Sequence, residues 1–75
     1  MQYAVVIEKG ATSYGAYVPD LPGCVAVAAT QAEVRRLIRE GIEIYLEEMR
    51  RDGASIPAPT SQVEYVHVTE TVSAA

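Results

Sequence analysis

Tryptophan and phenylalanine are absent from the 75-residue chain, and cysteine and histidine each occur once. The single cysteine, Cys24, excludes an internal disulfide and a multi-cysteine zinc site. Long apolar runs are missing too, since the N-terminal one ends at Glu8 and Lys9 and has no basic segment before it. It is too short for a signal peptide or a membrane span, so we expect a cytoplasmic protein without membrane contact.

Motifs of enzyme chemistry are also missing. The chain has no GxGxxG, GxxxxGK[ST] or HExxH pattern. Cys24 and the only histidine, His67, lie on separate predicted strands, where a small apolar residue and a surface residue are the usual interpretation. The acidic residues of the strands lie near strand ends and do not converge as the ligands of a two-metal nuclease must. We therefore expect no catalytic residue, no metal ligand and no cofactor.

Size and charge together favour a protein partner. The length leaves room for one domain, residues 1–75, with no separate DNA-binding domain. A domain this small buries only about 60% of the surface of its unfolded chain, so a second chain is a simple way to cover more. Ten acidic against six basic residues give a net charge of −4, which disfavours direct binding of nucleic acid and favours a basic protein.

Residue patterns predict an α+β domain with the element order β-β-β-α-β. Runs of β-branched and aromatic residues bounded by turn residues indicate strands over residues 2–8, 14–18, 24–29 and 63–68. A proline-stiffened connector, residues 56–61, precedes the last strand, which a right-handed crossover would place parallel to the first. We therefore expect a mixed four-stranded sheet with one helix packed on one face, and frayed residues 73–75.

The helix has the clearest signal. Thr30 and Glu33 form a capping-box pattern, in which the Thr hydroxyl accepts from the Glu33 N–H and the Glu33 carboxylate reaches back, and Gly53 suits the other end. Gly41 costs about 1 kcal/mol relative to alanine inside a helix, which predicts a backbone that lies close against the sheet. Apolar residues at spacings of three and four form one stripe: Val34, Leu37, Ile38, Gly41, Ile42, Tyr45, Leu46 and Met49.

The predicted strands are apolar on both faces. In the first strand Tyr3, Val5 and Ile7 share one face, and Ala4 and Val6 take the other. One helix covers only one face, so the second face predicts an interface and a homo-oligomer, dimer or larger. The alternative is that the small residues leave too little apolar area for an interface.

Acidic residues recur along the helix at Glu40, Glu43 and Glu47. They are possible partner-binding residues, because an acidic face steers a basic protein toward it. The more usual interpretation of such a run is a solvated face that is stabilised by pairs at i and i+4. The pairs available are Arg36–Glu40, Arg39–Glu43 and Glu47–Arg51.

The stretch from Tyr14 to Cys24 resembles the signature of the HicB-type antitoxin family. It has the form Tyr-x-Ala-x-x-Pro-Asp-Leu-Pro-Gly-Cys, and the likeness continues through Arg-Glu-Gly-Ile-Glu at 39–43 and Asp-Gly-x-x-Ile-Pro-x-Pro at 52–59. The chain departs from the family pattern at Ala28 and Ala29, where a glycine is expected, and at Val34, where alanine is usual. We call residues 17–24 the signature loop; its motif residues are Tyr17, Pro19, Asp20, Leu21, Pro22, Gly23 and Cys24.

The resemblance implies a degenerate ribonuclease H-like fold without nuclease carboxylates. It also implies a function, since family members bind and mask a small HicA-type toxin that cleaves RNA. On this interpretation the chain is an antitoxin of a toxin-antitoxin system. The alternative is a stand-alone, self-associating structural or ligand-binding module without a toxin, and a degenerate hydrolase is a third possibility.

Overall fold

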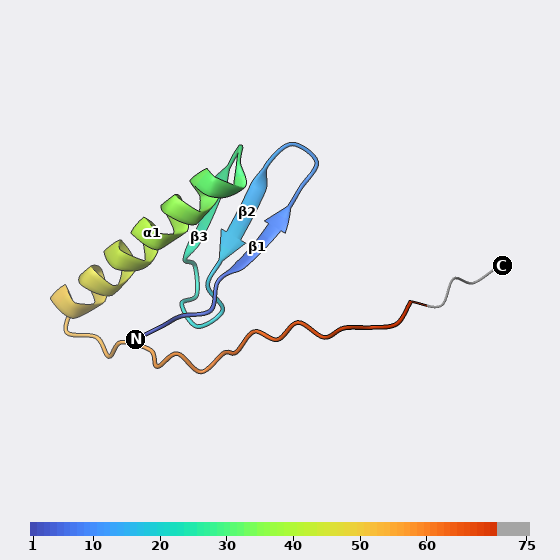
Figure 1. Cartoon of the computed structure of the whole chain (residues 1–75). Coiled ribbons are helices and arrows are strands. Elements are labelled where there is room, and N and C mark those ends of the chain that lie inside the picture. Colours follow the sequence, from blue (N-terminus) through green and yellow to red (C-terminus); the bar gives the residue numbers. More distant parts are fainter. Residues whose placement is uncertain (71–75) are drawn as a thin grey trace.

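A computed structural model describes residues 1–70 of the chain, which form a three-stranded antiparallel sheet followed by one helix (Figure 1). The strands are β1 (Val6–Lys9), β2 (Tyr14–Tyr17) and β3 (Val25–Ala28), hydrogen-bonded in the order β1-β2-β3. The helix is α1 (Gln31–Arg51). These elements confirm the predicted α+β class and the order of its first four elements. The fraying predicted for residues 73–75 lies outside the described residues.

The first strand is shorter than predicted because its neighbour ends early. The register pairs Val6 with Tyr17 at the last position of β2. Further pairing would require Val18 and Pro19, but Pro19 has no N–H, and the Val18 N–H donates to the carbonyl of Cys24 at 3.2 Å. The chain before Val6 therefore lies beside the signature loop without a ladder of its own.

Helix α1 packs mainly on β3 and β2. All eight residues of the predicted apolar stripe are buried or half-buried, which confirms the helical spacing. β1 receives less cover from α1, so Ile7 in β1 and Val5 just before it stay only half-buried although they pack against the core. The core consists of sheet, loop and helix residues: Ala16, Val18, Leu21, Cys24, Ala28, Val34, Ile38 and Leu46.

Both ends of α1 form largely as predicted. The Thr30 hydroxyl accepts from the Glu33 N–H at 3.2 Å, although the Glu33 carboxylate does not bond back to the cap. Gly53 follows the helix with φ +71°, a conformation that L side chains rarely adopt. A methyl group added at Gly41 would lie 3.8 Å from the Sγ of Cys24, so the backbone is indeed near the sheet, yet alanine would fit.

The predicted fourth strand, residues 63–68, is not part of the sheet. Within residues 1–70 the sheet has three antiparallel strands, so neither a mixed four-stranded sheet nor a ribonuclease H-like fold is present there. Residues 62–70, which we call the C-terminal arm, are exposed and extend away from the sheet and helix (Figure 1). The alternating residue pattern of the arm is a local property of the sequence, whereas a strand also needs a neighbouring strand to bond with. In this structure the arm is not paired with β1 or with any other strand.

Candidate functional site

The sheet face opposite α1 carries uncovered apolar side chains. The strand register makes Val6, Tyr17 and Val25 neighbours across the three strands. Val25 and Val27 are 67% and 68% exposed, while the alanines that alternate with them point toward α1. Gly15 lies in the same face, and a methyl group there would meet nothing within 4 Å. This open sheet face is therefore mainly apolar, with Glu8 at its edge, and apolar surfaces of this kind often bind partners.

Backbone hydrogen bonds close the signature loop into a compact corner. The Leu21 N–H donates to the carbonyl of Val18 at 3.1 Å, and the Cys24 N–H donates to that of Leu21 at 3.0 Å. Gly23 has φ +83°, which disfavours any other residue. The Leu21 side chain is fully buried, so it holds the corner against the core. The loop residues left on the surface are Tyr17, Pro19, Pro22 and Gly23.

Cys24 and His67 do not form a nucleophile and base. Cys24 is buried in the core, and this burial raises the pKa of its thiol, which keeps it in the unreactive neutral form. His67 lies in the exposed C-terminal arm and shares no hydrogen bond with Cys24. Within residues 1–70, no three His, Cys, Asp or Glu side chains come together as ligands for a metal ion.

Asp20 ties the signature loop to the chain just before the arm. Its carboxylate accepts from the Ser61 N–H at 3.0 Å, from the Ser61 hydroxyl at 2.9 Å and from the Thr60 hydroxyl at 3.1 Å. The Ser61 N–H contributes most to holding the pKa of Asp20 below its ordinary value, and desolvation opposes it only in part. Sequence spacing gave no signal for this contact, because the partners are about 40 positions apart.

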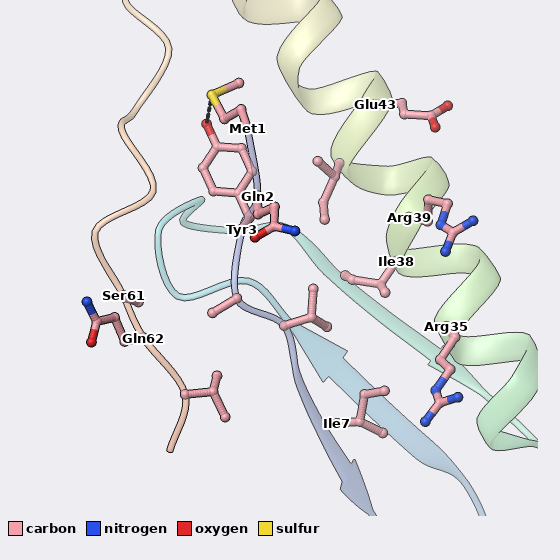
Figure 2. Close-up of a pocket in the computed structure, with 14 residues that line it drawn as sticks. Met1, Gln2, Tyr3, Ile7, Arg35, Ile38, Arg39, Glu43, Ser61 and Gln62 are labelled. Atoms are coloured by element: carbon pink, nitrogen blue, oxygen red, sulfur yellow. Dashed lines mark hydrogen bonds between the residues drawn. The ribbon is translucent and has the colours of Figure 1, made fainter. Parts of the chain in front are cut away.

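An open groove of about 1060 Å³ runs beside β1. Figure 2 shows its boundaries: the N-terminal residues leading into β1, the start of the C-terminal segment at Ser61 and Gln62, and α1. The floor is apolar, with Val5, Ile7 and Ile38 among its residues. The charged residues at its helix side are Arg35, Arg39 and Glu43. We call this feature the edge groove.

The predicted acidic residues are all exposed on α1. Glu40 pairs with Arg36 and Glu47 pairs with Arg51, each at 3.1 Å, whereas the predicted pair of Arg39 and Glu43 does not form. Glu43 lines the edge groove instead.

One apolar residue on the outer face of α1 escaped the sequence analysis. Ile44 is 57% exposed and lies one helical turn from both Glu40 and Glu47. The sequence could have indicated Ile44, because it is the one large aliphatic residue of the helix outside the apolar stripe with spacings of three and four.

The candidate residues thus divide between two separate places. No hydrogen bond or ion pair in the described part of the chain joins Glu40, Glu43 or Glu47 to the signature loop. The loop is mainly a structural corner that holds the C-terminal segment, and the outer face of α1 is a charged surface with an apolar centre. Over residues 1–70, no helix is both long and apolar enough to cross a membrane.

Comparison with known proteins identifies the family. HicB-like antitoxins of bacterial toxin-antitoxin systems match residues 3–73 of this chain. The chain belongs to this family. The match includes the signature loop and all four elements of the structure, and it confirms the family that the sequence resemblance indicated.

Relatives differ in how much of their length they share with the chain. An uncharacterized 14.9 kDa protein from the rep-hol intergenic region of Haemophilus phage HP1 is 31% identical over 70 residues, which is 93% of this chain and 53% of that protein. A UPF0150 protein of Helicobacter pylori is 45% identical over 47 residues, 63% of this chain and 65% of that protein. A UPF0150 protein of Thermoplasma acidophilum is 34% identical over 68 residues, 89% of this chain and 99% of that protein.

The chain therefore spans about half the length of the phage protein and just under two thirds of the Helicobacter one. No solved structure matches the chain.

Proposed function

We propose that this HicB-like chain binds a small, basic, RNA-cleaving toxin of the HicA type in the cytoplasm and masks it without catalysing a reaction. The observation that carries the proposal is the family match over residues 3–73. The net charge of −4 supports it, because a protein that binds RNA needs a basic surface that this chain can complement.

The outer face of α1 is the surface best suited to such a toxin. Glu40, Glu43 and Glu47 form an acidic border on consecutive turns, and the exposed Ile44 lies among them. Interfaces commonly combine a desolvated apolar centre with a polar rim. The rim charges act mainly on the rate of association, and their effect falls as salt screens them.

A self-associating module is the second candidate. The open sheet face favours it, because the apolar side chains of Val25 and Val27 remain exposed there. The two functions are compatible, since the open sheet face and the outer face of α1 use different residues.

Association kinetics with a HicA-type toxin test the first proposal. Changing Glu40, Glu43 and Glu47 together to Lys should slow association at low salt by about tenfold and weaken its salt dependence. The same change removes two ion pairs and adds like-charge contacts, so the free energy of unfolding should fall by about 1 kcal/mol. Circular dichroism must show that the variant is folded.

A charge-swapped helix is the matched control. Exchanging Arg36 with Glu40 and Glu47 with Arg51 keeps the net charge and both i,i+4 attractions. It should associate within about twofold of the unmodified chain if the overall acidic field of the helix steers the toxin. No binding of the unmodified chain to the toxin would contradict the antitoxin function, whereas binding with an unchanged rate in the triple Lys variant would move the interface elsewhere.

A further inference from the structure

The C-terminal arm has the composition of a strand but no strand partner within residues 1–70. Its apolar side chains are largely in water, from 56% exposed at Val63 to 96% at Tyr65. Val66 and Val68 are exposed to a similar degree. An extended segment of this kind gains ladder hydrogen bonds and buries apolar surface when it is added to the edge of a sheet.

A matching sheet edge is present at β1. The strand order leaves β1 at the edge of the sheet, with no neighbour on its outer side in the described part of the chain. The edge groove runs beside it with an apolar floor that includes Val5, Ile7 and Ile38. An unpaired edge next to an apolar groove is a surface that proteins normally cover.

The connector, residues 56–61, keeps the arm from filling the edge groove of the same chain. The Tyr3 hydroxyl donates to the carbonyl of Pro57, and Asp20 holds Ser61. Pro57 and Pro59 stiffen the segment between these contacts. As a result, Ser61 and Val63 form a wall of the edge groove instead of filling it.

The overall shape reflects this arrangement. The radius of gyration is 16.0 Å, against about 11 Å for a compact domain of this length. The extents of 58 × 28 × 17 Å show an elongated molecule, and in Figure 1 the arm extends beyond the sheet and helix.

We propose that the arm pairs with the β1 edge of a second copy of this chain, whose own arm fills the edge groove of the first. Each copy offers one arm and one groove, so the exchange closes as a two-fold dimer. Val63 and Tyr65 alternate along the arm and so share one face, which in the exchange lies on the partner's groove floor; within one chain the same two residues border pockets that contain Val5 and Ile7. This exchange supplies, from the partner, the fourth strand that is missing from the sheet.

The charges around the groove agree with an arm as its occupant. Lys9, Arg35 and Arg39 line the edge groove and the smaller pocket that adjoins it, with Glu43 as the single acid. The arm carries Glu64 and Glu70 and neither lysine nor arginine. Arm and groove therefore attract one another, while two arms or two grooves alone would not.

Sedimentation of the chain without any toxin tests the exchange. The unmodified chain should have twice the mass of one chain at micromolar concentration, and truncation after Ser61 should give a monomer. Replacing Val63 and Tyr65 by Ser should raise the dissociation constant of the dimer at least tenfold. Replacing Val25 and Val27 by Ser on the open sheet face is the matched control and should leave the dimer intact. A dimer that survives the arm variants and dissociates with the sheet-face variants would overturn the proposal.

Isotope-filtered nuclear Overhauser measurements on mixed labelled and unlabelled chains decide whose arm fills the groove. Contacts between β1 and residues 63–68 should link two different chains. A short Gly-Ser insertion between Ala58 and Pro59 should let the arm reach its own β1 and yield a monomer, because exchange depends on a short, stiff hinge. Contacts confined to one chain in the unmodified protein would overturn the proposal. Neither result depends on whether the chain binds a toxin.

Discussion

The carboxylate of Asp20 connects two segments that are distant in sequence, because it accepts from Thr60 and twice from Ser61. Donors that bond the charged carboxylate favour ionisation, so the pKa of Asp20 lies below its ordinary value of 3.8, chiefly because of the Ser61 N–H. The folded pKa is thus below the unfolded one. The hydrogen bonds from Thr60 and Ser61 to the ionised Asp20 carboxylate therefore stabilise the fold fully above pH 3.8. This stabilisation is lost as the pH falls through the folded pKa.

An NMR titration of the Ser61 amide checks this sign. Its proton shift should titrate with a midpoint below pH 3.8, and Asp20→Asn should abolish that titration. Replacing the hydroxyl donors, with Thr60→Val and Ser61→Ala together, should raise the pKa of Asp20 only part of the way, because the backbone N–H remains. A midpoint at or above 3.8 in the unmodified chain would mean that Asp20 does not hold Thr60 and Ser61 in solution.

Among the elements, the sequence was most informative where the signal is local. The three-and-four spacing and the Thr30 cap predicted α1 closely, because a helix satisfies its own backbone. Strand lengths were less predictable. β1 begins only at Val6, because Pro19 and the signature loop offer no hydrogen-bond partners to the residues before it. The arm could not be predicted in this way: its residue pattern is that of a strand, but its pairing depends on the direction in which the distant residues Asp20 and Tyr3 hold the chain.

Glycine in α1 offers a test of helix packing. Gly41→Ala should increase the free energy of unfolding by up to about 1 kcal/mol, because the new methyl group would lie 3.8 Å from Cys24 Sγ and helix propensity would improve. Urea denaturation measures the change. Gly53→Ala is the contrasting substitution: φ is +71° there, so stability should fall by about 1 kcal/mol. A destabilising Gly41→Ala would show that helix and sheet leave no room for a methyl group.

At the scale of the whole molecule, the two proposed interfaces share a single residue, Glu43. Glu40, Ile44 and Glu47 lie outside the edge groove, whereas arm exchange uses β1 and that groove. A dimer formed by exchanged arms would therefore leave both outer helix faces free, and each could take one toxin. Glu43 is the only acidic residue of the three that borders both surfaces.

Exchange also makes the stability of the molecule depend on its concentration. If the edge groove is filled only by the partner's arm, unfolding separates two chains, and each tenfold rise in protein concentration favours the folded dimer by about 1.4 kcal/mol. For two chains of this length, the thermal midpoint should rise by about 4 °C per tenfold increase, as followed by circular dichroism. The chain truncated after Ser61 is the control, and its midpoint should not change with concentration. A concentration-independent midpoint in the full chain, over a range where sedimentation detects dimer, would show that the copies associate without completing each other's fold.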